Sequence, residues 1–201
     1  MINQASKDIL CDKLGRLLDL AVSNKVHFQV ITDVLAKSSL LKNIENNNFY
    51  ELENNDVTSL YNHYFGYTYF EDKINNFNDA YWCGQIYVNL FYKYNKSFSY
   101  IFLKLPLAQL LDMYSVYHEM DISSIYEVFE KQEKENTILD LLLKKHSMKS
   151  TELAKMTKIK INTLKAYKLS DINLYKGSFS NIHRIAMVLD EPDNLFLETL
   201  F

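Results

Sequence analysis

Glycine, proline and cysteine are all scarce in this chain of 201 residues. Four Gly and two Pro are too few for the many turns of a β-sandwich or β-barrel, so we expect helices joined by polar loops. The two cysteines, Cys11 and Cys83, lie far apart in the sequence and show no spacing typical of metal ligands. We expect them to be reduced thiols of a cytoplasmic protein.

Long apolar runs are missing as well. The longest strongly apolar stretch, residues 100–107, is interrupted by Lys104 and is much shorter than the roughly 20 residues of a membrane-spanning helix. The first residues, Met1 to Gln4, lack the charged and apolar regions of a signal peptide. We therefore expect a protein that does not enter the membrane.

Motifs of enzymes are also absent. The sequence contains no phosphate-binding glycine loop, no zinc-protease motif and no nucleophile elbow. His118 and Glu119 are a pair suited to acid–base or metal chemistry, but no second His or Cys stands at ligand spacing from them. We therefore predict no enzymatic activity, no cofactor, no catalytic residue and no metal ligand.

The residues that are present indicate a mainly α fold. Hydrophobic residues make up 48% of the chain and aromatic residues 14%, enough to build a core. Apolar residues recur with helical spacing along much of the sequence. The helices predicted in the first part of the chain span residues 6–22, 26–45, 57–65, 79–94, 97–103 and 106–117.

A charged stretch, Glu130 to Glu135, marks the predicted domain boundary. Upstream of it, the pattern Ser124-Ile125-Tyr126-Glu127 predicts a capping box that opens a helix. That helix either continues through the charged stretch or ends before it and leaves an exposed connector. We therefore predict an acidic, aromatic-rich helical domain over residues 1–130 and a second domain over residues 136–201.

Five short helices are predicted in the C-terminal domain. They comprise Ile138–Lys145, a segment N-capped by Ser150, Asn162–Lys168, Phe179–Leu189 and a last segment opened by Pro192. A loop through Asp171 and Gly177 joins the third helix to the fourth. The apolar tail, Leu195-Phe196-Leu197 and Leu200-Phe201, either completes the core or forms a dimer contact.

Charge is distributed unevenly along the chain. Residues 1–143 contain 12 Lys/Arg against 19 Asp/Glu, a net charge of −7. Residues 144–184 contain 10 Lys/Arg against only two acids, a net charge of +8. A basic segment on an acidic protein is typical of a localised contact with nucleic acid rather than of a protein coated by it.

Residues 153–164, Leu-Ala-Lys-Met-Thr-Lys-Ile-Lys-Ile-Asn-Thr-Leu, resemble the helix-turn-helix of the Xre-type family, that of lambda repressor and Cro. In that family a Leu-Ala pair begins the second helix and polar residues open the third. Residues 179–189 and 192–196 resemble the fourth and fifth helices. One departure is Lys158, which stands where the family usually has Gly with a positive φ, at a cost of about 1 kcal/mol.

The resemblance implies a five-helix domain that binds double-stranded DNA, with the third helix entering the major groove. Its chemistry suits base edges, since Asn pairs with adenine, Lys reaches guanine acceptors and Ile touches a thymine methyl group. The residues implied to contact bases are Lys160, Ile161, Asn162 and Lys165. The residues implied to contact phosphates are Lys149, Ser150 and Thr151, at the N-terminus of the second helix, and Lys168 and Lys176.

The aromatic residues between positions 61 and 94 allow two interpretations. They are either a base-stacking surface for single strands or a tyrosine-rich core or partner-binding groove. We favour the second interpretation, because few basic residues (Lys73, Lys93 and Lys96) are interleaved with them. The aromatic residues are Tyr61, Tyr64, Phe65, Tyr67, Tyr69, Phe70, Tyr81, Trp82, Tyr87, Phe91, Tyr92 and Tyr94.

We expect a sequence-specific transcriptional regulator, in the first instance a repressor. Because such units usually read two half-sites, we expect a homodimer, with the N-terminal domain dimerising or binding a protein partner. The alternative is a protein inhibitor, such as an antitoxin or an anti-defence protein of a phage or mobile element. In that case the acidic N-terminal domain binds an enzyme and the helix-turn-helix autoregulates the operon. The Asn/Lys/Ile/Tyr-rich N-terminal part weakly resembles helical proteins of low-GC Gram-positive bacteria, which implies no activity. A protein-only use of the basic helical domain also remains open.

Overall fold

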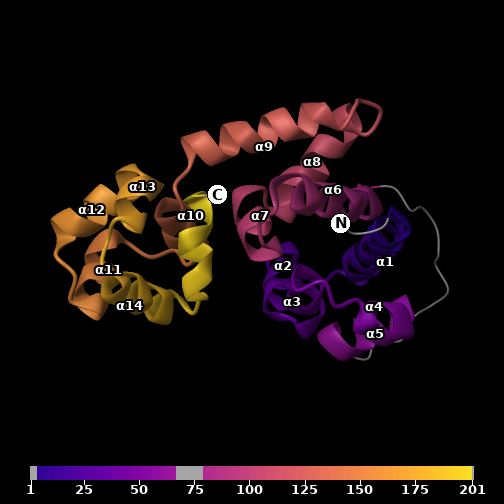
Figure 1. Cartoon of the computed structure of the whole chain (residues 1–201), viewed down its shortest axis with the longest axis horizontal. Coiled ribbons are helices and arrows are strands. Elements are labelled where there is room, and N and C mark those ends of the chain that lie inside the picture. The colour runs from indigo at the N-terminus through magenta and orange to yellow at the C-terminus, as the bar shows by residue number, and fades with distance from the viewer. Residues whose placement is uncertain (1–3, 67–78, 201) are drawn as a thin grey trace. The chain divides into compact units, whose positions relative to one another are not determined.

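The computed structural model describes residues 4–66 and 79–200 of the chain, and Figure 1 shows their helices. The described residues contain no strand, which confirms the mainly α prediction. Their contacts divide the chain into two compact units, Met1–Glu127 (unit 1) and Val128–Phe201 (unit 2). In these described ranges no helix is both long and apolar enough to span a bilayer.

Unit 1 contains eight complete helices among its described residues, and a ninth crosses into unit 2. Their bounds are α1 Gln4–Ser23, α2 Phe28–Lys37, α3 Ser39–Glu45, α4 Tyr50–Asn54, α5 Val57–Phe65, α6 Asp79–Tyr94, α7 Phe98–Lys104, α8 Leu107–Tyr117 and α9 Ser123–Glu135. The prediction of one helix over residues 26–45 is wrong. Ser38 has an extended backbone and its Oγ accepts from Leu41 N at 3.2 Å, so it ends α2 and caps α3.

The core of unit 1 is built on close contact between α1 and α6. An added Cβ at Gly84 of α6 would lie 2.5 Å from Cα of Gly15 in α1, so the two helix backbones touch. Leu14 and Leu18 of α1 are buried, as is Ile86 of α6. The absence of side chains at both glycines therefore permits a helix crossing that no larger residue would allow.

The described aromatic residues between positions 61 and 94 enter the core of unit 1 only in part: three are buried (Tyr61, Tyr87 and Phe91) and six are half-buried (Tyr64, Phe65, Tyr81, Trp82, Tyr92 and Tyr94). Tyr61, Tyr87 and Tyr100 are fully buried, and the Tyr87 hydroxyl donates to the Leu105 carbonyl at 3.0 Å. Lys96, which the sequence interleaves with the aromatic residues, is buried with its Nζ 5.6 Å from the centre of the Tyr100 ring. The buried residues agree with the interpretation as a core, and the half-buried ones leave the partner-binding groove open. Tyr67, Tyr69, Phe70 and Lys73 lie outside the described residues.

Unit 2 has five complete α-helices and a final 3₁₀ helix in its described part. Their bounds are α10 Ile138–Lys145, α11 Ser150–Thr157, α12 Ile161–Leu169, α13 Asp171–Tyr175, α14 Phe179–Leu189 and η1 Asp193–Leu200. Two predictions need correction: a short helix, α13, occupies the expected loop, and the last segment is 3₁₀ rather than α. The α13 helix forms because Ser170 Oγ accepts from Ile172 N at 3.2 Å and so caps it.

The charged stretch belongs to α9, not to an exposed connector. The helix begins one residue before the predicted capping box, and Asp121 Oδ1 accepts from Ser123 N at 2.8 Å. The chain then breaks at Thr137, whose Oγ1 accepts from Asp140 N at 3.3 Å and caps α10. A side-chain cap, rather than the charge run, therefore sets the start of α10.

The core of unit 2 draws on every helix from α10 to η1. Its buried residues include Leu139, Leu142, Leu153, Leu164, Leu174, Ile182, Ile185, Leu195 and Phe196. Since Leu195 and Phe196 are almost completely buried, they complete this core. For these two residues the structure supports the first of the two roles open from sequence; the side chains of Leu200 and Phe201 lie outside the described ones.

Candidate nucleic-acid interface

The turn between α11 and α12 passes through the left-handed region of backbone space. Lys158 has φ 58° and ψ 23°, a conformation that favours glycine. Next to it, Thr157 Oγ1 donates to the Leu153 carbonyl at 2.7 Å and accepts from Ile159 N at 3.3 Å. Thr157 thus closes the turn, a role that we did not infer from its sequence. The signal was a Thr in the last turn of a predicted helix.

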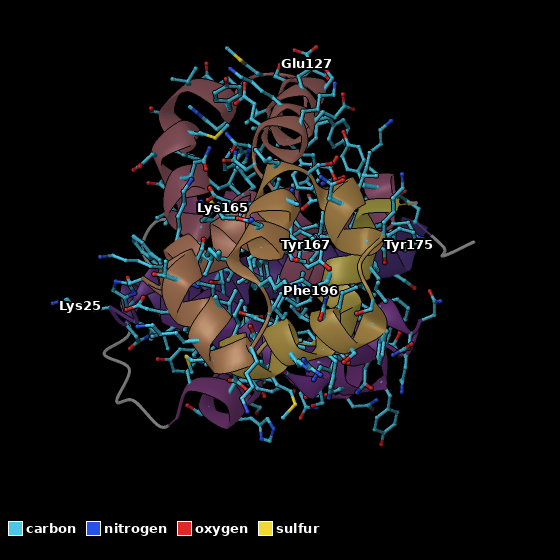
Figure 2. The ribbon with its side chains drawn as sticks, turned by 90° about the vertical axis from the view of Figure 1, so that its left-hand side faces the viewer. Lys25, Glu127, Lys165, Tyr167, Tyr175 and Phe196 are labelled. Carbon is cyan, nitrogen blue, oxygen red and sulfur yellow. The ribbon has the colours of Figure 1, made fainter. Side chains whose placement is uncertain are left out.

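Buried apolar residues fix α12 against the rest of unit 2. Leu164 is inaccessible, and Ile159, in the turn before the helix, is only 6% exposed. Tyr167 is also buried, so it and Lys165 lie on different faces of α12; Figure 2 labels both. These anchors leave one face of α12 free to meet a ligand.

The exposed face of α12 carries the residues expected to read bases. Asn162 and Lys165 are exposed and three residues apart, so they are neighbours on the helix surface. Lys160 is exposed and forms the N-cap, at the positive end of the helix dipole. Ile161 is half-buried, which limits its reach. The structure therefore exposes three of the four expected base-contacting residues between the N-cap and the middle of α12.

The N-terminus of α11 differs from its prediction. Lys149 is the N-cap, and Ser150 is the first helical residue, so the predicted Ser150 cap is wrong. The Lys149 backbone N–H donates to Glu152 Oε2 at 2.7 Å. This carboxylate already occupies part of the helix N-terminus, and an incoming phosphate would have to share the site with it. Thr151 is exposed and Ser150 is half-buried.

Lys168 has an acidic partner within unit 2. Its Nζ lies 2.8 Å from Asp140 Oδ1, and Lys144 Nζ lies 2.7 Å from Asp140 Oδ2. Partial burial raises the pKa of Asp140, but the hydrogen bonds and charges of the two lysines outweigh it and hold the pKa below its ordinary value. Lys168 therefore joins α12 to α10, and its charge is partly neutralised. Lys176 is exposed.

Further basic side chains are exposed around the same helices. Lys155 of α11 and Lys158 of the turn are exposed, as is Arg184 of α14. All three belong to the basic segment of residues 144–184, and that segment is the feature of the sequence from which they could have been predicted as contacts. They add positive charge on unit 2 to that of Lys160 and Lys165.

The remaining titratable groups of unit 2 support its fold. Glu191, whose side chain is 7% exposed, accepts from Lys145 Nζ at 2.6 Å, and His146 Nε2 lies 3.3 Å from the same oxygen. His183 Nδ1 lies 2.9 Å from Asp193 Oδ2. These contacts tie α10 and α14 to the segment around η1. Within the described ranges, no group of three or more His, Cys, Asp or Glu residues could hold a metal ion.

No family model matches the sequence, and searches of curated proteins and of solved structures find no match. The geometry and charge of α11 and α12 are therefore the basis for proposing a function.

Proposed function

We propose that the chain is a sequence-specific regulator of transcription, a repressor, that binds double-stranded DNA through α12. The observation that carries the proposal is the exposed pair Asn162 and Lys165, with Lys160 at the helix N-cap, on a helix held by buried Ile159 and Leu164. A rigid helix with polar residues at its exposed N-terminal end suits insertion into a major groove. Occupation of promoter DNA would block transcription.

The chemistry of the three residues supports base reading. An Asn side chain offers one donor and one acceptor to the edge of adenine, and Lys donates to O6 or N7 of guanine. Each good base contact contributes about 1–3 kcal/mol of discrimination against the wrong base. We expect Asn162 and Lys165 to specify neighbouring base pairs, with Lys160 at the groove entrance.

Phosphate contacts would supply the rest of the affinity. The exposed side chains Lys149, Thr151 and Lys176 are the strongest candidates. Lys168 is a weaker one, because Asp140 already neutralises part of its charge. The net charge of +8 over residues 144–184 attracts DNA despite the negative total charge of the chain.

A second candidate function, enzyme inhibition, is favoured by the acidity of unit 1. Residues 1–127 contain 10 Lys/Arg against 15 Asp/Glu, a net charge of −5. Between α1 and the α4–α5 segment lies a groove of about 710 Å³ whose charged lining has four acids against two bases (Asp12, Asp19, Glu53 and Asp56 against Lys13 and Arg16). Such a surface suits a basic protein partner, as in an antitoxin or an anti-defence protein. Capture of one defined enzyme by the full chain, and loss of its activity, would favour this function.

The test of DNA binding is a pull-down of sheared genomic DNA by the full-length protein over a series of salt concentrations. The test variant is Lys160→Ala/Asn162→Ala/Lys165→Ala. The control, Lys42→Ala/Lys134→Ala, also removes two positive charges, but from exposed helix positions outside the candidate interface. We expect the wild-type and control proteins to enrich one inverted-repeat site and the test variant to lose at least about 10-fold in affinity for it.

Salt provides the second criterion. The logarithm of affinity should fall linearly with the logarithm of salt concentration, with a slope of about −0.9 for each phosphate contacted. Enrichment of no site at any salt concentration would refute the proposed function. If the test variant enriches the same site as strongly as the wild-type protein, α12 does not contact the DNA.

A further inference from the structure

The groove between α1 and the α4–α5 segment has the size of a small-molecule site, about 710 Å³. On α1 its lining residues Asp12, Arg16, Asp19 and Ser23 recur every three or four positions, so they form a stripe about 16 Å long. Residues 53–58 line the opposite side. The groove therefore follows about three turns of α1 and suits an extended ligand.

The two cations that line the groove are engaged within unit 1. Arg16 Nε lies 2.9 Å from Asp12 Oδ2 and forms an ion pair with it. Lys13 Nζ donates to the backbone carbonyl of Leu52 and, at 2.9 Å, to that of Asn55. Two bases against four acids leave the lining with a net charge of −2.

The side-chain amides of the groove are engaged as donors as well. Asn54 Nδ2 donates to the Tyr50 carbonyl at 2.8 Å, and Asn55 Nδ2 donates to the Glu51 carbonyl at 2.8 Å. Every cationic or amide side chain of the lining thus already donates to a partner within unit 1. A ligand in the groove would find mainly acceptors.

Two carboxylates of the groove are available to such a ligand. Asp19 of α1 and Glu53 of α4 form no hydrogen bond and no ion pair with another described residue. Partial burial, and then the charge of Asp79 nearby, raise the pKa of Asp19 above its ordinary value. A cation bound beside Asp19 would compensate both effects.

The acids of the groove are spread along it rather than gathered at one point. In the described ranges no three His, Cys, Asp or Glu residues form a group that could hold a metal ion. Leu20 of α1 and Val57 of α5, both half-buried, add apolar surface to the two sides. Separated carboxylates and apolar side chains together suit an extended cation with an aliphatic body, as the stem and head of a lysine side chain would require.

We propose that this groove binds a linear aliphatic polyamine, whose ammonium groups pair with Asp19 and Glu53 and whose methylene groups contact Leu20 and Val57. A protonated polyamine has N–H donors and no acceptors, so it matches a lining whose own cationic and amide donors are engaged. A basic peptide has similar charges, but its backbone carbonyls also need donors. The inference does not depend on DNA binding by α12, and a protein partner would use the wider acidic surface of unit 1.

The test is calorimetric titration of the full-length protein with the triamine spermidine in the absence of DNA, which itself attracts polyamines. The test variant is Asp19→Asn/Glu53→Gln. The control, Asp112→Asn/Glu127→Gln, removes the same two charges from exposed positions of α8 and α9 that do not line the groove. The comparison ligands are butylamine, Mg²⁺ and an end-blocked trilysine peptide, which has as many positive charges as spermidine.

We expect one spermidine to bind each wild-type or control chain, and the test variant to lose at least about 10-fold in affinity because two charge-assisted hydrogen bonds are removed. Butylamine, which has a single ammonium group, should bind at least about 10-fold more weakly than spermidine. Thermal unfolding without ligand should not weaken in the test variant. The raised pKa of Asp19 means that its negative charge does not stabilise the fold.

The other outcomes overturn the inference. Equal losses in the test and control variants would reduce the binding to general attraction by an acidic unit, and no spermidine binding at all would leave the groove without this ligand. Tighter binding of Mg²⁺ would indicate a metal site, and tighter binding of trilysine would assign the groove to a protein partner. Because no DNA is present, the result is independent of the proposed function, and either proposal can fail without the other.

Discussion

The two units of this protein reach compactness by different means. In unit 1 two long helices, α1 and α6, meet at Gly15 and Gly84 with their backbones in contact. In unit 2 the helices α10 to α14 have 5 to 11 residues, and side-chain caps at Thr137, Ser170 and Ser178 begin three of them. Side-chain caps also begin α2, α3, α5 and α7 of unit 1, so the feature that sets unit 1 apart is the close backbone crossing of its two long helices.

Surface charge distinguishes the units as well. Unit 1 has a net charge of −5, whereas unit 2, with 12 Lys/Arg against 10 Asp/Glu, has a net charge of +2, and its residues 144–184 alone have a net charge of +8. Trp82, the only tryptophan of the chain, lies in unit 1 and packs edge-on against Tyr114 at 5.6 Å between ring centres. Its fluorescence therefore reports on unit 1, while far-UV circular dichroism reports on both units. This pair of signals allows the comparison to be tested unit by unit.

The largest effect is expected for Gly84→Ala. The new methyl group would lie 2.5 Å from Gly15 Cα and 2.6 Å from Gly15 N, and neither backbone atom can move without shifting a helix. We expect the free energy of unfolding to fall by about 3 kcal/mol, at the upper end for overpacked cores. Urea unfolding followed by Trp82 fluorescence measures this loss.

Ser115→Ala, at an exposed position of α8, is the control and should change stability little. If Gly84→Ala proves neutral, the close crossing of α1 and α6 is wrong. If circular dichroism and DNA binding are lost at the same urea concentration as Trp82 fluorescence, the two units unfold together, and their stabilities cannot be compared separately.

A smaller effect of opposite sign is expected in unit 2 for Lys158→Gly. Glycine adopts the φ of 58° without the steric cost that Lys158 bears. We expect the free energy of unfolding to rise by about 0.5–1 kcal/mol. The relief of backbone strain in the folded state outweighs the stabilisation of the unfolded chain by the more flexible glycine. Thermal unfolding followed by circular dichroism measures the gain.

Lys155→Gly is a matched control because it removes the same charge from an exposed position inside α11. There glycine should cost about 1 kcal/mol. Destabilisation by both substitutions would show that the left-handed turn is not a source of strain.

The smallest effect is expected for Asp140→Asn and depends on pH. The folded-state pKa of Asp140 is lowered, so its ionised form stabilises the fold above the unfolded-state pKa of about 4. This contribution is lost as pH falls through the lowered folded-state pKa. The variant should therefore be less stable than the wild type at neutral pH, and the difference should disappear at low pH.

Urea unfolding at several pH values, followed by circular dichroism, measures this difference. Glu135→Gln is the control, because the pair of Glu135 with Lys131 is 3.9 Å long and exposed. A difference for Asp140→Asn that stays constant down to low pH would contradict the lowered pKa.

Where apolar residues recur with strong helical periodicity, both the helix and its first and last residues could be predicted from the sequence. The bounds of α5, α6, α10 and α14 agree with prediction, because apolar spacing in each segment ends at a capping or turn residue. The predictions failed where a side-chain hydrogen bond interrupts a continuous pattern. Ser38 divides residues 26–45 in this way, and Ser170 begins α13 within the expected loop.

The candidate site was predictable only in part. Exposure of Lys160, Asn162 and Lys165 follows from a helix whose opposite face is apolar, so the sequence indicated it. Two further properties depend on residues distant in the sequence: Asp140 neutralises Lys168, and Glu152 takes part of the N-terminus of α11. Leu169, the last residue of α12, exposes 81% of its surface, and this could not be inferred either, because an apolar residue at a helix end is usually part of the core.

The sequence by itself determined that this protein is helical, acidic in its first part and basic over residues 144–184, because helical periodicity and net charge are properties of local residue order. The tertiary structure alone decided that Gly15 and Gly84 form a backbone crossing, that Leu195 and Phe196 complete a core, and that Leu169 remains uncovered. The physical reason is that burial and pairing depend on which surfaces meet in space, and residues far apart in the chain supply those surfaces.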